Sequence, residues 1–226
     1  MLKILRNKKK TKIILIGLAA IIILSFVFFG FDDVLGNKGK KGYIGKLSGQ
    51  KVSLIEYKDS LDAVKNLAIM QYGDNLEEMS KSLNLEAQAW QRLALLKEAK
   101  KNRIKASDRE VIEQIEKYPF FMRQGRFDKR TYDELLKYVF HTQARTFEEQ
   151  VRQNIMISKL YKEVTDGLSL DDKEIRDGYI EINKALNPKF KLDEKKYLSE
   201  KKEFETGILE KKKQQYFSGF IVKLLK

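Results

Sequence analysis

The side chains that most often perform catalysis are scarce in this 226-residue chain. His141 is the only histidine and cysteine is absent, so one chain cannot build a metal site from imidazole or thiolate ligands. A nucleophile with a histidine base would have to use His141, which lies between two expected helices and is better interpreted as a loop residue. The carboxylates are evenly spread and matched by lysines, and no glycine-rich phosphate loop occurs. We therefore expect no enzyme, no metal and no cofactor.

An aromatic segment suggests binding instead. Residues 118–128 read YPFFMRQGRFD and place four aromatic rings within ten positions. Two interpretations are open. The rings can fill the core where helices meet, which is the commoner role of a single ring, or some of them can line an apolar groove for a polypeptide segment.

The elements around this segment are expected to be helices. A side chain able to cap a helix precedes an acidic residue by three at Ser53, Ser107, Thr146 and Ser169, and Asp128 can cap in the same way. Leu54, Tyr57, Leu61 and Val64 form one apolar face of the first of these helices. Together the patterns predict an all-α domain with one small hairpin at 43–52 and helices near 53–71, 76–102, 108–117, 129–140, 147–166, 171–182 and 196–225.

The N-terminus carries a membrane signal. Residues 13–31 hold no charge and would span roughly 28 Å as a helix, close to the thickness of a bilayer core. Six basic residues precede this span and Asp32 and Asp33 follow it. The positive-inside rule then predicts a cytoplasmic tail at 1–12, a transmembrane helix at 13–31 and export of the rest.

The net charge of +13 includes six basic residues of the tail, which leaves +7 on the exported part. Lysine and glutamate alternate along that part, as on solvated helix surfaces, and export argues further against nucleic acid as a partner.

Six pieces of sequence, in order, resemble the N-terminal domain of the SurA/PpiD group of periplasmic chaperones and foldases, over Gly42 to about Tyr179. They are residues 44–53, 90–99, 104–111, 119–132, 147–152 and 170–179. The N-terminal span makes the resemblance closer to the membrane-anchored PpiD branch. In that group a parvulin isomerase domain of roughly a hundred residues follows the last piece, whereas here only residues 183–195 precede the final helix. The resemblance also implies that this helix packs back onto the domain through Phe204, Ile208, Tyr216, Phe220 and Leu224.

The expected organisation is a tail, a transmembrane helix, a linker at 32–42, a SurA-N-like domain at 43–182, a connection at 183–195 and a C-terminal helix at 196–226. The resemblance implies a chaperone in the inner membrane, with its bulk in the periplasm, that binds unfolded or nascent exported polypeptides without ATP or isomerase activity. The alternative is an adaptor for one membrane partner, such as a translocon component. The expected client-binding residues are Phe120, Phe121, Met122, Phe127 and Tyr132.

Overall fold

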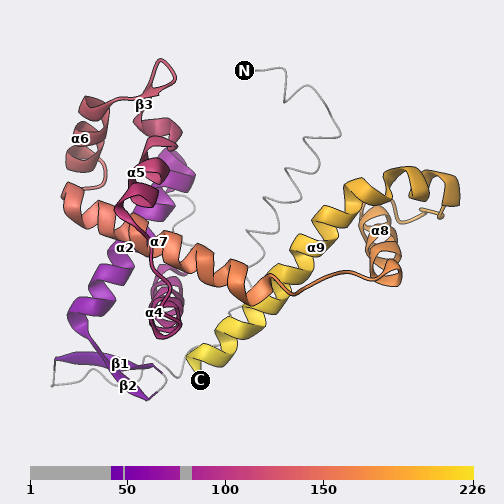
Figure 1. Cartoon of the computed structure of the whole chain (residues 1–226), viewed down its shortest axis with the longest axis horizontal. Coiled ribbons are helices and arrows are strands. Elements are labelled where there is room, and N and C mark those ends of the chain that lie inside the picture. The colour runs from indigo at the N-terminus through magenta and orange to yellow at the C-terminus, as the bar shows by residue number, and fades with distance from the viewer. Residues whose placement is uncertain (1–41, 48, 77–82) are drawn as a thin grey trace. The chain divides into compact units, whose positions relative to one another are not determined.

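The structure is a computed structural model that describes residues 42–47, 49–76 and 83–226. These residues fall into two compact units, one of residues up to 163 together with 221–226, and one of residues 164–220. The elements are shown along the chain in Figure 1. They are β1 (Tyr43–Leu47), β2 (Gln50–Ser53), α2 (Leu54–Tyr72), η1 (Gly73–Asn75), α4 (Leu85–Lys101), α5 (Asp108–Glu116), η2 (Pro119–Phe121), β3 (Met122–Arg123), β4 (Arg126–Phe127), α6 (Lys129–Tyr138), α7 (Ala144–Thr165), α8 (Asp172–Leu186) and α9 (Glu194–Leu225).

One half of the larger unit is built from the β1–β2 hairpin, α2 and α4. Ser53 and Glu56 form the predicted capping box, which satisfies free backbone groups at the start of α2. Trp90 of α4 lies against Gly45, where an added Cβ would come within 2.8 Å of the indole ring. Leu224 and Leu225, at the end of α9, pack against the same core cluster. The final turn of α9 therefore contributes to this unit. Of the residues predicted to pack back, Leu224 lies in this cluster, whereas Phe204 and Ile208 pack with Tyr179 of α8.

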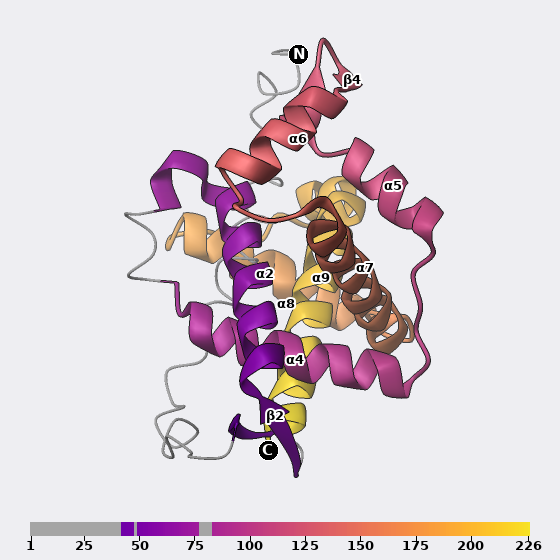
Figure 2. The same cartoon turned by 90° about the vertical axis from the view of Figure 1, so that its left-hand side faces the viewer.

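The other half of the larger unit surrounds aromatic side chains. Rings from η2, the β3–β4 hairpin, α6 and α7 gather here, and α5 packs against them with Val111 and Ile115. Figure 2 shows the hairpin projecting beyond α5 and α6. Pro119 stands at the first position of η2, where its missing N–H costs nothing.

The smaller unit is a pair of helices, α8 and α9, joined by residues 187–193. Tyr179 is fully buried in a small core with Ile175, Tyr197 and Ile208. Ion pairs line the outside of the pair, including Lys211–Glu181 at 2.8 Å and Lys212–Glu174 at 2.5 Å.

Several predictions are confirmed and others are wrong in detail. The expected helix at 76–102 is not continuous, because Leu83 and Asn84 are not helical and Asn84 caps α4, which begins at Leu85; residues 77–82 lie outside the described residues. Thr146 lies inside α7 and is not its N-cap, and Asp171, not Ser169, caps α8. The predicted stripe on the final helix is not one face, because steps of four advance about 40° each. Ile208 of that stripe is buried, but Tyr216 is 54% exposed.

The predicted transmembrane helix at 13–31, the tail before it and most of the 32–42 linker lie outside the described residues. Within the part of the chain that the structure describes, no helix is long and apolar enough to cross a membrane.

Candidate functional site

The aromatic segment folds into one cluster, which we call the aromatic cluster. Phe121 lies at its centre, with the Phe120 ring centroid at 4.5 Å, Tyr132 at 4.9 Å and Phe147 at 5.6 Å. Most of these ring pairs meet edge to face, the arrangement that the charge distribution of aromatic rings favours. The cluster consists of Tyr118, Phe120, Phe121, Phe127, Tyr132, Phe140 and Phe147.

Burial divides the five predicted client-binding residues into two groups. Phe121 is 0% exposed and Tyr132 is 6% exposed, so both form part of the core. Phe120 and Phe127 are half-buried and pack against that core, and Met122 is half-buried as well. A ligand can therefore touch Phe120, Met122 and Phe127 on the folded protein, whereas Phe121 and Tyr132 would have to leave the core first. A role in client binding stays a prediction for all five.

The tyrosines of the cluster behave as apolar groups. Burial raises the pKa of the Tyr118 hydroxyl, and burial followed by the Glu148 and Asp133 carboxylates raises the pKa of Tyr132. Both hydroxyls therefore stay neutral over the physiological range, and the cluster offers no titratable phenol for chemistry.

The β3–β4 hairpin follows the rings directly, and sequence reasoning missed it. Met122 pairs with Phe127 and Arg123 pairs with Arg126 in an antiparallel ladder. Gln124 and Gly125 both have positive φ, 54° and 78°, which a two-residue turn between twisted strands requires. The only sequence signal was Gln-Gly between two short runs, and it is weaker than the usual Asn-Gly. The backbone N–H of Asp128 donates to the Phe121 carbonyl at 2.9 Å and holds the hairpin beside η2.

Two exposed apolar side chains lie next to each other at the start of α2. Leu54 is 58% and Ile55 is 73% exposed. The predicted apolar face that included Leu54 is therefore wrong at this residue. The buried stripe of α2 begins one turn later at Tyr57, whose ring centroid lies 5.3 Å from that of Trp90.

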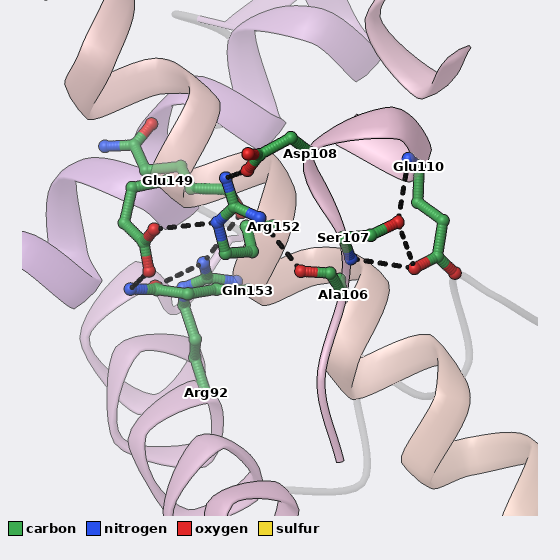
Figure 3. A network of polar contacts seen from close by, with 9 residues as sticks. Arg92, Ala106, Ser107, Asp108, Glu110, Glu149, Arg152 and Gln153 are labelled. Carbon is green, nitrogen blue, oxygen red and sulfur yellow. Dashed lines mark hydrogen bonds and ion pairs between the residues drawn. The ribbon is translucent and has the colours of Figure 1, made fainter. Parts of the chain in front are cut away.

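A polar network holds the segment before α5 against α7 (Figure 3). Arg152 donates to the Ala106 carbonyl at 2.8 Å, to the Asp108 carboxylate at 2.7 Å and to Glu149 at 3.1 Å. Ser107 and Glu110 form the predicted capping box of α5. The Arg152 guanidinium of α7 thus binds both Ala106, just before α5, and Asp108, the first residue of α5, and so it holds the start of α5 against α7.

Arg92 lies in the same view but in the core, 5% exposed. It donates to the Gln153 side chain at 3.0 Å, to the Gln150 carbonyl at 3.3 Å and to the Asn154 side chain. Among the described residues its Nε has no partner, and burial lowers the pKa of the guanidinium to about 10. The arginine thus joins α4 to α7 through neutral acceptors, and sequence reasoning did not single it out.

Side chains suited to holding a metal ion do not converge in the described residues. No group of three or more His, Asp or Glu residues there could hold a metal ion. His141 is exposed, with φ of 48°, in the turn between α6 and α7.

Residues 1–161 match the family model of the SurA-like N-terminal domain. No curated protein and no solved structure matches the chain. The family match spans most of the 226 residues and includes the aromatic cluster, the hairpin and the network around Arg152. The chain therefore belongs to the family of SurA-like N-terminal domains, which is a chaperone-type family that binds polypeptides.

Proposed function

We propose that this protein is a membrane-anchored chaperone outside the cytoplasm, which binds unfolded or newly translocated polypeptides without ATP and without catalysis. The observation that carries the proposal is the half-buried edge of the aromatic cluster, formed by Phe120, Met122 and Phe127, on a domain of a polypeptide-binding family.

The composition of this edge suits weak binding to many sequences. Aromatic rings and a flexible methionine side chain contact apolar groups of different shapes. Promiscuous binders use such adaptable surfaces, since their ligands differ in sequence. Because Phe121 and Tyr132 form the buried part of the cluster, the half-buried edge is accessible without unfolding of the domain.

The absence of isomerase activity is proposed from the internal architecture. Seven residues, 187–193, join α8 to α9, at the place where the resemblance would put a parvulin domain of roughly a hundred residues. Anchoring is proposed from the uncharged residues 13–31 and the six basic residues before them.

Function is tested with the full-length chain in nanodiscs of zwitterionic phospholipid. We expect it to suppress the light scattering of a denatured, aggregating client and to leave proline-limited refolding, which takes tens of seconds or more, at its uncatalysed rate. Unchanged scattering would refute the chaperone proposal, and faster proline-limited refolding would refute the lack of catalysis.

Topology is tested separately in cells. Protease added to intact spheroplasts is expected to digest the residues beyond Phe31, and protection until lysis would reverse the proposed orientation. A photocrosslinker at Met122, with Lys162 as a control position, separates a chaperone from a dedicated adaptor. Many exported chains are expected at Met122, and capture of one partner alone would favour the adaptor.

A further inference from the structure

The tip of the β3–β4 hairpin brings two arginines together. Arg123 and Arg126 are cross-strand partners and both are exposed. Directly opposite residues of an antiparallel pair lie on the same face, with Cβ atoms about 4.5–5.5 Å apart. Neither guanidinium lies within ion-pair distance of a carboxylate in the part of the chain that the structure describes, although Arg123 is close enough to Asp128 to add to the hydrogen bonds that lower the pKa of that carboxyl. Two like charges therefore face each other on one side of the hairpin, while Met122 and Phe127 occupy the other side.

This arrangement lowers the stability of the hairpin in two ways, both within residues 123–126. Like charges directly opposite each other destabilise a strand pair. In addition, Gln124 has φ of 54° in the turn, a conformation that residues other than glycine, asparagine and aspartate rarely adopt. Local strain of this kind gathers at sites with a function. A carboxylate placed between the two guanidiniums would remove the repulsion and gain charge-assisted hydrogen bonds.

We propose that Arg123 and Arg126 bind the carboxylate of an acidic side chain in the client polypeptide, so that this chaperone prefers clients with an acidic residue next to an apolar stretch. The inference rests on the proposed function, because the hairpin adjoins the aromatic edge where the client is placed. Arg123 follows Met122 directly and Arg126 precedes Phe127. A bound segment can thus reach the rings and the arginines within a few residues of its own length.

The neighbouring charges favour a single carboxylate over an anionic membrane surface. Polybasic segments that bind such surfaces carry about four to eight basic residues. Here the next two basic residues, Lys129 and Arg130, are already paired with acidic residues of α6 at 2.6 and 2.8 Å. The carboxylates of Glu116 and Asp128 also lie close in sequence. These two carboxylates would repel a dense anionic layer more strongly than they would repel a single carboxylate group.

The test compares two fluorescent, unfolded peptides that share aromatic residues and differ only in carrying Asp and Glu or the isosteric Asn and Gln. Binding to the full-length protein in zwitterionic nanodiscs is followed by anisotropy. We expect the acidic peptide to bind about two- to thirtyfold more tightly, the range for two exposed charge pairs, with a preference that shrinks as salt increases.

Two variants test whether this preference comes from the hairpin arginines. The double variant Arg123→Gln with Arg126→Gln should abolish it and leave the affinity for the amide peptide unchanged. Its melting temperature should not fall, since the repulsion is relieved. Arg145→Gln, the same change at an exposed position on the first turn of α7, should keep the preference.

Four outcomes would overturn the inference. The first is equal affinity of the unmodified protein for both peptides, and the second is an equal loss of affinity for both peptides in the double variant. The third is loss of the preference for the acidic peptide in Arg145→Gln. The fourth is protection of the 122–127 amides from hydrogen exchange by anionic nanodiscs but not by the acidic peptide. In the last case the arginines would belong to a membrane contact. Binding of the amide peptide keeps the proposed function intact in each of these outcomes, whereas failure of both peptides to bind would remove the proposed function itself.

Discussion

Phe120 and Phe121 are neighbours in the chain, but their rings have different surroundings. The Phe121 ring is fully buried and contacts rings from η2, α6, α7 and the segment between those helices. The Phe120 ring stacks with Tyr118 at 5.2 Å and stays half-buried. One ring therefore maintains the fold, while the other is free to contact a ligand.

This difference gives a prediction for two alanine variants. Phe121→Ala should lower the free energy of unfolding by about 3–5 kcal/mol, the usual cost of removing a buried phenylalanine. Phe120→Ala should cost clearly less, because part of its ring is already in water, yet it should weaken aggregation suppression. Urea denaturation and light scattering measure the two effects. Equal destabilisation by both variants would show that Phe120 is a core residue without a binding role.

Arg92 leads to a second prediction at this scale. Its planar guanidinium reaches three acceptors on α7 at once, which the ammonium of lysine cannot do in the same geometry. Arg92→Lys should therefore lower the free energy of unfolding by about 2–3 kcal/mol, because buried acceptors lose their donors. Arg109→Lys, the same change at an exposed position of α5, is the control. Wild-type stability of Arg92→Lys would show that charge alone is needed.

At the scale of elements, capping chemistry explains which boundaries could be predicted. The starts of α2, α5 and α6 follow from Ser53, Ser107 and Asp128, which accept from the backbone as expected. Thr146 and Ser169 have the same spacing but are not N-caps, since α7 begins earlier, at Ala144, and α8 begins later, after Asp171. Spacing alone allows several starts, and the contacts of the helix with the rest of the fold select one of them.

The start of α5 also carries a pH dependence. Hydrogen bonds from Lys159 and then from Ser107 lower the pKa of the Glu110 carboxyl to about 2, from an ordinary value of 4.5. A carboxyl whose pKa is lower in the folded state adds stability above pH 4.5, and this stability is lost as the pH falls towards 2. Melting curves of the wild type and Glu110→Gln should differ at neutral pH and converge in acid. A constant difference at every pH would contradict this linkage.

The α8–α9 pair depends on one close approach. A Cβ added at Gly178 would lie 2.9 Å from three carbons of Ile208, which is buried between the helices. Gly178→Ala should therefore destabilise this unit, although alanine favours helix more than glycine does. Gly207→Ala is the matched control, because nothing lies within 4 Å of its added Cβ, and it should raise stability by up to about 1 kcal/mol. Calorimetry measures the stability of both variants. Equal stabilisation by both would contradict the prediction and show that the Ile208 side chain moves to accommodate the added methyl group.

At the scale of the whole molecule, the helical class and the order of elements could be predicted because each helix has its own local periodicity. The division of the described chain into two units could not, since it depends on contacts between residues far apart in sequence. The same holds for the candidate site. Its rings were evident from residues 118–128, but which of them reach the surface depends on α6 and α7, as Tyr132 and Phe147 show.

The end of α9 provides the last prediction, because it joins the final residues of the chain to its first described elements. Leu224 and Leu225 pack against the cluster that contains Leu47, Val52 and Trp90. Fully buried apolar side chains contribute about 1.5–3 kcal/mol each, and partly buried ones contribute less. The double variant Leu224→Ala with Leu225→Ala should thus lower the stability of the larger unit by about 2–4 kcal/mol. It should also speed hydrogen exchange of the β1–β2 amides, since the hairpin loses part of its cover. Lys223→Ala, at an exposed position of the same turn, should change neither quantity. If the double variant unfolds at the wild-type midpoint with unchanged exchange in β1–β2, the last turn of α9 does not support the hairpin, and its leucines would be available for another contact.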